Sequence, residues 1–296
     1  MDTYREFISY VESNKDYAPT TVFFYRTHCA IILRKMHRLG IDTDPKDLTA
    51  DELKIILEYI RANHPPSTQK DYLVPLKMMC RFAGNHVFDE VKIAYAQDYR
   101  PNVDWLEFDD CMTILHTWMT PMQELLLSLM LLHGLRKCET VRLTIDDLHE
   151  DYMTVIGKGR FGGKRRSIPY HQDFKRSLDR WMKERNELLS QCDDPYNQPR
   201  NVLVYLRGKR LRVYDQLKGS GITKQIRELS ERCGIDFSAH TLRRTFGREL
   251  FRSGVSIEVI ATIYGHDSTS VTMRYLGLDM DDMTDALKKM RLRFLD

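Results

Sequence analysis

The strongest constraint on the fold is a segment near the middle of the chain, residues 121–133, that is apolar on almost every side. A helix without a polar face must be buried inside a larger domain. The apolar run within it, from Glu124 to His133, is about half as long as a helix that crosses a bilayer. The sequence therefore predicts a soluble protein with a helical domain built around this segment, and no membrane partner.

The first hundred residues show the three-to-four spacing of apolar positions that is typical of helices. This spacing predicts helices over residues 3–13 and 20–38. The pattern Thr49-Ala-Asp-Glu52 predicts a capping box at the start of a third helix. A fourth helix is expected to follow a pair of prolines and to run to about Phe82. These four helices predict a small all-helical domain.

A stretch without periodicity, residues 95–103, contains a proline and is interpreted as a linker. It separates an expected helical domain over residues 1–97 from a second domain over residues 104–296. Asp104 is expected to cap the first helix of the second domain, from Trp105 to about residue 118.

The periodicity then changes from that of helices to that of strands. Residues Tyr152–Ile156 and Arg166–Tyr170 predict a two-stranded hairpin joined by a glycine-rich turn. The fold class is therefore mainly α with a small β-hairpin. The remaining periodic segments predict helices over residues 172–190, 222–233, 240–253, 256–264, 268–275 and 281–292.

The composition restricts the class of protein but does not identify a binding partner. The formal net charge is only +3, so any nucleic-acid surface must come from local clustering of charge. The six cysteines include no Cys-x-x-Cys pair, which argues against a structural zinc or a disulfide framework. The N-terminus has no basic and apolar pattern of a signal peptide. We expect a cytoplasmic protein without a metal.

Two short motifs carry residue types that suit phosphate chemistry. His240 and Arg243 are three residues apart, so on a helix both project from one face towards a shared anion. Arg136 follows the apolar segment directly, and Glu139 stands one helical turn later. Each motif also has an ordinary explanation as surface charge, and Tyr275 alone would most simply be a packed aromatic residue.

Two basic runs add positive charge. The turn of the expected hairpin, within residues 157–168, mixes glycine with lysine and arginine, and residues 207–212 form a second run. Such segments are either solvated loops or contacts to a nucleic-acid backbone. The candidate DNA contacts in these runs are Arg160, Lys164, Arg165, Arg166, Arg207, Lys209 and Arg210, and Arg244, next to Arg243, is a further candidate.

These separate signals occur in the order and at the spacings of a known family. The matching pieces are Gly134-Leu-Arg136-x-x-Glu139 with Leu143 and Asp147, Gly157-Lys158-Gly159, His240-x-Leu-Arg243-x-Thr-Phe246, and Gly265-His266 with Thr272 and Tyr275. With them, the chain resembles the tyrosine recombinases or phage integrases, most nearly their Xer-like members. The resemblance covers roughly residues 105–285. Through Pro19-Thr20-Thr21 and Tyr25, the N-terminal part is similar, less specifically, to the core-binding domain of that family.

The resemblance implies a role for each residue and no cofactor. Tyr275 would attack a DNA phosphodiester, and Arg136, Arg243 and His266 would stabilise the charge on its non-bridging oxygens. His240 would be the general base and Lys158 the general acid, with Glu139 orienting Arg136. The turn after Lys158 is longer than the usual Xer-type form, so Lys164 remains an alternative general acid. Tyr264 replaces a usual leucine and Arg244 a common histidine; neither is expected to carry the chemistry.

The resemblance further implies double-stranded DNA as the partner, gripped between the two domains as in a clamp. The C-terminal segment, residues 281–296, would dock on a neighbouring copy and build a tetramer that brings two sites together in the nucleoid. The reaction would give integration, excision or resolution. Alternatives are a type IB topoisomerase that relaxes supercoils, a catalytically inactive DNA-binding relative, and a metal-dependent nuclease.

Overall fold

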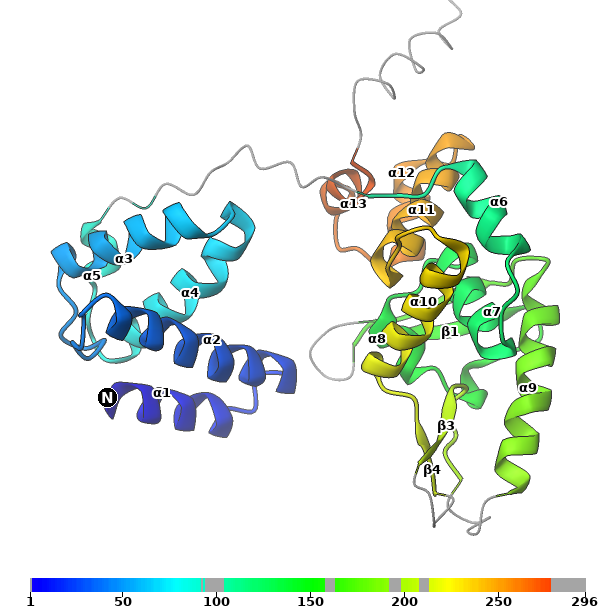
Figure 1. Ribbon diagram of the computed structural model, residues 1–296, viewed down its shortest axis with the longest axis horizontal. Coiled ribbons are helices and arrows are strands. Elements are labelled where there is room, and N and C mark those ends of the chain that lie inside the picture. Colours follow the sequence, from blue (N-terminus) through cyan, green and yellow to red (C-terminus); the bar gives the residue numbers. More distant parts are fainter. Residues whose placement is uncertain are drawn as a thin grey trace, which may run out of the picture. The chain divides into compact units, whose positions relative to one another are not determined.

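The structure is a computed structural model, and it describes residues 2–91, 93, 104–157, 163–191, 198–207 and 213–277. The chain divides into two compact units, Met1–Arg100 and Pro101–Asp296 (Figure 1). Each unit has its own apolar core. Fold class is confirmed: the described elements are mainly helical, with short antiparallel strands.

The first unit is built from short helices around one core. The capping box is confirmed, because the Thr49 hydroxyl accepts a hydrogen bond from the backbone N–H of Glu52 and the Glu52 carboxylate accepts one from the backbone N–H of Thr49. A short fifth helix was not expected from the sequence. The helices are α1 (Asp2–Ser13), α2 (Pro19–Arg38), α3 (Ala50–Asn63), α4 (Pro66–Phe82) and α5 (Val87–Glu90).

The apolar segment that dominated the sequence lies in the centre of the second unit, as expected. It forms α7 (Pro121–Leu127) and continues as a π-helical turn, η1 (Ser128–Leu132). Most of its apolar side chains are buried, and Leu125 and Leu129 are fully so. The helix before it, α6 (Phe108–His116), begins three residues later than expected, because Glu107 and not Asp104 is its N-terminal cap.

The other helices of the second unit surround this centre. Thr120 and Ser238 each accept a hydrogen bond from a backbone N–H of the first turn that follows, which fixes where α7 and α11 begin. These helices are α8 (Lys137–Arg142), η2 (Ile145–Asp147), α9 (Phe174–Ser190), α10 (Gly219–Cys233), α11 (Ala239–Arg252), α12 (Ile257–Tyr264) and α13 (Thr269–Leu276). The expected helix over 281–292 lies outside the described residues.

The expected hairpin is present one residue from its predicted position. Strand β1 (Tyr152–Ile156) pairs antiparallel with β2 (Arg165–Pro169), and Val155 faces Arg166 across the pair. A second antiparallel pair, β3 (Val204–Arg207) with β4 (Val213–Gln216), was not predicted. These strands are only four residues long, too short for a clear alternation of polar and apolar residues, and the basic run between them is typical of a loop. Among the described helices, none is long and apolar enough to cross a membrane.

Candidate active site

The first candidate arginine lies where the buried π-helical turn ends. Gly134 there has φ +63°, and a Cβ atom at this position would come within 2.6 Å of the Phe246 ring, so only glycine fits. The chain then turns into α8, for which Arg136 is the N-terminal cap residue. The backbone N–H of Arg136 donates to Glu139 Oε2 at 2.8 Å, and its Nη1 donates to Glu139 Oε1 at 2.8 Å. Glu139 therefore fixes both the backbone and the side chain of Arg136.

The second candidate arginine, Arg243, extends from α11 into the interior, and its side chain is only 1% exposed. Its Nη1 donates to the carbonyl oxygen of Gly134, and its Nη2 donates to the carbonyl oxygen of Tyr264 at 3.1 Å. Burial, and next the charge of Arg136, lower the pKa of Arg243 to about 10. It therefore remains a cation at neutral pH.

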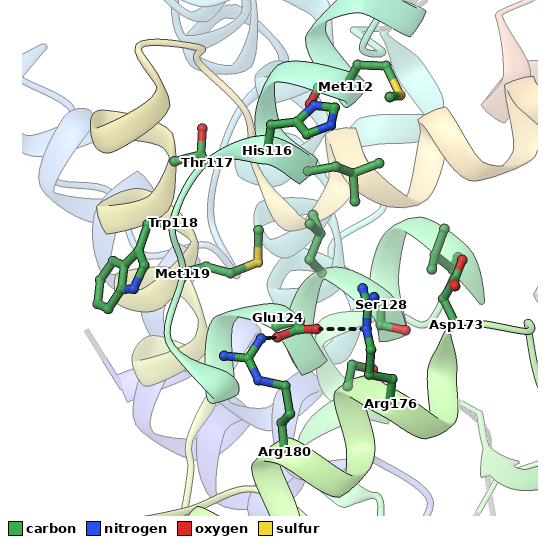
Figure 2. A pocket seen from close by; sticks show the side chains of 14 residues that line it. Met112, His116, Thr117, Trp118, Met119, Glu124, Ser128, Asp173, Arg176 and Arg180 are labelled. Carbon is green, nitrogen blue, oxygen red and sulfur yellow. Dashed lines mark hydrogen bonds and ion pairs between the residues drawn. The ribbon is translucent and has the colours of Figure 1, made fainter.

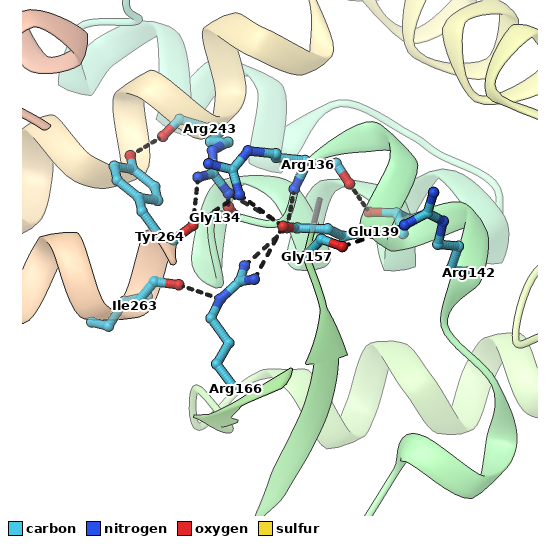
Figure 3. Close-up of polar contacts among 10 residues, drawn as sticks. Gly134, Arg136, Glu139, Arg142, Gly157, Arg166, Arg243, Ile263 and Tyr264 are labelled. Atoms are coloured by element: carbon cyan, nitrogen blue, oxygen red, sulfur yellow. Dashed lines mark hydrogen bonds and ion pairs between the residues drawn. The ribbon is translucent and has the colours of Figure 1, made fainter. Parts of the chain in front are cut away.

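The C-terminal end of α12 collects guanidinium groups from three other elements (Figure 3). The last carbonyls of a helix lack partners within the helix and carry partial negative charge, so they attract cations. The carbonyl oxygen of Tyr264 accepts from Arg136 at 2.9 Å as well as from Arg243, and that of Ile263 accepts from Arg166 Nε at 2.7 Å. Gly265, at φ +62°, ends the helix here.

Glu139 is the carboxylate at the centre of this cluster, and its side chain is fully buried. Arg166 binds it with two hydrogen bonds, of 3.0 and 2.9 Å, in addition to the bond from Arg136. Burial alone would raise the pKa of Glu139, but these arginines and the backbone N–H of Arg136 lower it overall. Since three guanidiniums surround one carboxylate, two positive charges remain uncompensated, and Arg136 is the most exposed of the three, at 21%.

His266 stands directly after the end of α12. Its Nδ1 is 2.9 Å from the hydroxyl of the buried Thr272. Burial, followed by the charges of Arg243 and Arg136, lowers the pKa of His266 to about 4. The imidazole is therefore neutral at physiological pH, and a proton on Nε2 can be donated to an anion if Nδ1 accepts from Thr272.

Tyr275 lies on α13, packed against the same cluster. Its ring centroid is 5.7 Å from the Arg243 guanidinium carbon, 5.7 Å from the His266 ring and 5.3 Å from the Tyr264 ring. Its hydroxyl is buried and makes no hydrogen bond of ordinary geometry to any described residue. Burial raises the pKa of Tyr275, while the charges of Arg243 and Arg244 offset part of that rise. Within the part of the chain that the structure describes, a buried hydroxyl without an acceptor, next to an arginine cluster, is the most distinctive feature of the site.

The structure brings Arg136, Arg243, His266 and Tyr275 together with Glu139. His240 is exposed in the first turn of α11, one turn before Arg243. Lys164 forms an exposed ion pair with Asp267, beside His266. The expected residues Lys158, Arg160, Lys209 and Arg210 lie outside the described residues. So does the side chain of Arg207.

Arg166 was expected to contact DNA, and its side chain points into the arginine cluster. It is 11% exposed and is bound to Glu139 and to the end of α12. It shares a strand face with the buried Ile168, so the two-residue alternation of β2 was the signal that placed it inwards. Arg244 is half-buried, with its guanidinium carbon 5.5 Å from the Tyr275 ring, whereas Arg165 is exposed.

A separate pocket of about 520 Å³ lies among α6, α7 and α9 (Figure 2). It is lined by apolar side chains such as Met119 and by charged ones, with Glu124 paired to Arg180. None of the expected catalytic residues lines it. Within the described ranges, no group of three His, Cys, Asp or Glu side chains converges in a way that would hold a metal ion.

Known proteins are similar to this chain in sequence and in structure. The model of the phage integrase family matches residues 104–281. Tyrosine recombinase XerA of Pyrococcus horikoshii is 26% identical over 169 residues, which is 57% of this chain and 55% of that protein. Tyrosine recombinase XerC of Lactobacillus delbrueckii subsp. bulgaricus is 23% identical over 297 residues, covering 96% of this chain and 97% of the relative. The chain spans only about half the length of the XerA relative that it matches.

Solved structures share the fold. A lambda integrase (75–356) dimer bound to a COC′ core site has a TM-score of 0.68 at 18% identity, and covers 100% of this chain and 98% of that chain. A lambda integrase tetramer bound to a Holliday junction has a TM-score of 0.69 at 19% identity, and covers 95% of this chain and 78% of that chain.

Proposed function

Because the chain belongs to the phage integrase family, we propose that it is a site-specific DNA recombinase that cuts and rejoins strands through a covalent phosphotyrosine at Tyr275. One observation carries the proposal. The hydroxyl of Tyr275 is buried and, among the described residues, makes no hydrogen bond of ordinary geometry, while Arg243 lies close enough to lower its pKa, beside a cluster in which three arginines face one carboxylate. Such a site attracts a phosphodiester and presents a nucleophile to it.

The arginine cluster supplies the electrostatic part of the reaction. Attack on a phosphodiester builds negative charge on the non-bridging oxygens, and donors fixed in advance stabilise it without reorganisation. Arg136 and Arg243 hold the oxygens, and the neutral His266 donates a further hydrogen bond. The two uncompensated positive charges of the cluster support this role.

Proton transfer completes the reaction. A phenol has a pKa of about 10, so Tyr275 must lose its proton as it attacks, and His240 accepts it. Lys158 gives a proton to the leaving 5′-oxygen; Lys164, which is paired with Asp267 beside His266, is the alternative donor. The products are a 3′-phosphotyrosyl bond and a free 5′-hydroxyl. Because the phosphoester energy stays in that bond, a second 5′-hydroxyl reverses the step without ATP, and the strands are joined.

The assembly follows from the same reaction. Exchange of strands between two sites requires several copies of the chain on double-stranded DNA, and we propose a tetramer. Residues 1–97 and 104–296 are proposed as the core-binding and catalytic domains that contact opposite sides of the duplex. The apolar residues of the C-terminal segment, among them Met283, Leu287 and Met290, are proposed to dock on a neighbouring copy. Exposed Arg165 is a candidate phosphate contact.

Capture of the covalent adduct tests the proposal. The purified protein is incubated with sheared genomic DNA from its host and with nicked duplexes, denatured, and run on a gel that separates adducts. Wild type is expected to form an adduct whose DNA can be sequenced, which identifies the target site. Tyr275→Phe should form none while binding the duplex with nearly unchanged affinity. An adduct formed by Tyr275→Phe would show that another residue is the nucleophile.

The same assay separates the alternative functions. Cleavage in EDTA excludes a metal-dependent nuclease. Relaxation of supercoiled DNA of any sequence, without joining of two sites, would favour a type IB topoisomerase. Binding of DNA without an adduct on any substrate would favour an inactive relative.

The general acid is identified with a modified substrate. Lys158→Ala should cleave an ordinary duplex slowly and a duplex with a 5′-thio leaving group at the rate of wild type, because a thiolate leaves without a proton. Lys164→Ala is the matched control. Rescue of Lys164→Ala instead of Lys158→Ala would move the general acid to Lys164.

A further inference from the structure

Tyr264 contacts the arginine cluster and the Tyr275 ring through its own ring, its hydroxyl and its carbonyl group. We propose that Tyr264 is a positioning residue. Its ring and carbonyl group hold Arg243, Arg136 and the Tyr275 ring in the relative positions that attack on the phosphate requires. This inference rests on the proposed function for its consequence in catalysis. The effect of Tyr264 on the arginine cluster can nevertheless be measured without DNA, because it concerns the positions of the arginines themselves.

The ring of Tyr264 lies against the guanidinium of Arg243, with 4.1 Å between the guanidinium carbon and the ring centroid. An aromatic face attracts a cation, and the attraction is strongest where water is excluded. Both groups are fully buried. The same ring meets the edge of Tyr275 at 5.3 Å and lies 5.1 Å from the ring of His266. One side chain therefore contacts three groups that are proposed to act on the phosphate.

The polar groups of Tyr264 fix its own position. Its hydroxyl donates to the backbone carbonyl of Arg243, and its own carbonyl accepts from both Arg136 and Arg243. Since burial raises the pKa of Tyr264, this phenol stays protonated and keeps its bond to the carbonyl. Tyr264 thus differs from Tyr275, whose hydroxyl has no such partner. The first tyrosine is held as a support, and the second is left available for reaction.

The surroundings of Tyr264 leave room for this ring and for little else. A Cβ atom at Gly247 would come within 2.2 Å of the Tyr264 hydroxyl, and one at Gly134 would come within 2.9 Å of its ring. Both neighbours are glycine, so the chain provides space on two sides of the ring. Leucine in place of Tyr264 would leave a void beneath Arg243 and remove the aromatic face that attracts its charge.

The test measures oxyanion affinity and strand cleavage in three full-length variants. Tyr264→Leu removes the ring, Tyr264→Phe keeps it and removes the hydroxyl, and Tyr170→Leu is the matched control. Tyr170 also donates its hydroxyl to a backbone carbonyl and packs its ring on an aromatic neighbour, Phe174, in the same unit. Binding of inorganic tungstate, a phosphate mimic, is measured by isothermal titration calorimetry. Cleavage is measured at saturating protein on the duplex recovered from the covalent adducts.

Tyr264→Leu should weaken tungstate binding by about tenfold, the loss of one good cation–π contact, and should slow cleavage by at least that factor. DNA affinity should stay within about threefold, because contacts along the backbone are unchanged. Tyr264→Phe should recover most of both losses. Tyr170→Leu should leave tungstate affinity and cleavage near wild type even where its melting temperature falls as far as that of Tyr264→Leu.

Two outcomes would overturn the inference. One is Tyr264→Leu binding tungstate and cleaving DNA within about threefold of wild type, a difference too small for one lost cation–π contact. The other is an equal loss in Tyr170→Leu at equal stability, which would assign the effect to folding. If wild type cleaves no DNA, the proposed function fails, while the tungstate comparison still decides whether Tyr264 positions the arginines.

Discussion

Among the described residues of the second unit, Arg185, Arg243 and Arg248 are almost completely buried. The regions around Arg185 and Arg243 differ, because only the second is part of the candidate site. Arg185 on α9 donates to the backbone carbonyls of Pro199 and Asn201, at 2.7 and 3.1 Å. Arg243 likewise donates to two backbone carbonyls. Burial alone lowers the pKa of Arg185, whereas the pKa of Arg243 also responds to Arg136, Glu139 and Tyr275.

Burial and hydrogen bonds to backbone carbonyls therefore do not by themselves distinguish a functional arginine from a structural one. Both regions satisfy the guanidinium with backbone oxygens, as any buried arginine requires. The difference lies in the charges that remain. Arg243 belongs to a cluster with excess positive charge next to the buried phenol of Tyr275, and excess charge is what a phosphate can neutralise.

The largest expected difference is in catalysis. Arg243→Lys keeps the charge but loses the planar group that donates in two directions, so single-turnover cleavage should fall by roughly a hundred- to a thousandfold. Arg185→Lys, the matched control, should cleave at nearly the wild-type rate. Equal rates for the two variants would remove the distinction between the regions.

The second effect concerns Glu139, the counter-charge of the Arg243 cluster. Glu139→Gln should lower the free energy of unfolding by about 3 kcal/mol at neutral pH, because it leaves three guanidiniums without a carboxylate. The arginines hold the folded pKa of Glu139 below its ordinary value. Its contribution is therefore complete above the ordinary carboxyl range and is lost as pH falls through the folded pKa.

Urea unfolding of wild type and Glu139→Gln at a series of pH values measures this contribution. The difference between them should be constant from pH 8 to about pH 5 and should shrink below that, where carboxyl groups begin to take up protons. A difference that grows as the solution becomes more acidic would contradict the ion-pair arrangement.

The third effect separates the two arginines by stability. Arg185→Met leaves two partly buried carbonyls without this donor and should cost roughly 2 kcal/mol or more in the free energy of unfolding. Arg243→Met also removes two donors, but it relieves repulsion with Arg136 and leaves Arg136 on the shared carbonyl of Tyr264. We therefore expect it to cost less. Chemical denaturation of both variants decides the order, and the reverse order would refute our account.

The smallest effect is an expected absence of change. Because the pKa of His266 is lowered to about 4, its charge should not change between pH 5.5 and 8. The ratio of cleavage rates of wild type and His266→Gln should therefore stay constant across this range. A ratio that changes around pH 6.5, the ordinary value for histidine, would show that the imidazole titrates there.

Much of the site was visible in the sequence because its motifs are local. The spacing of His240 and Arg243 and the step from Gly134 to Arg136 each describe one helix turn or one helix boundary, which short-range patterns report well. The capping box at Thr49 and the central apolar helix were found for the same reason.

What the sequence did not reveal depends on contacts between distant residues. Arg166 reaches Glu139 across 27 positions of the chain and Ile263 across 97, so a basic run concealed an inward side chain. Tyr264 is likewise ordinary as a single letter and becomes a support only when Arg243 folds against it. The pair β3 and β4 is too short for its alternation to be distinguished from a loop.

The end of α12 has a consequence for control of the enzyme. Its last two carbonyls are bound by arginines that come from three separate elements, and His266 follows within two residues. A molecule that tilts this one short helix would displace all of these groups together. If the proposed function holds, such a molecule would slow the reaction without competing with DNA for the phosphate position.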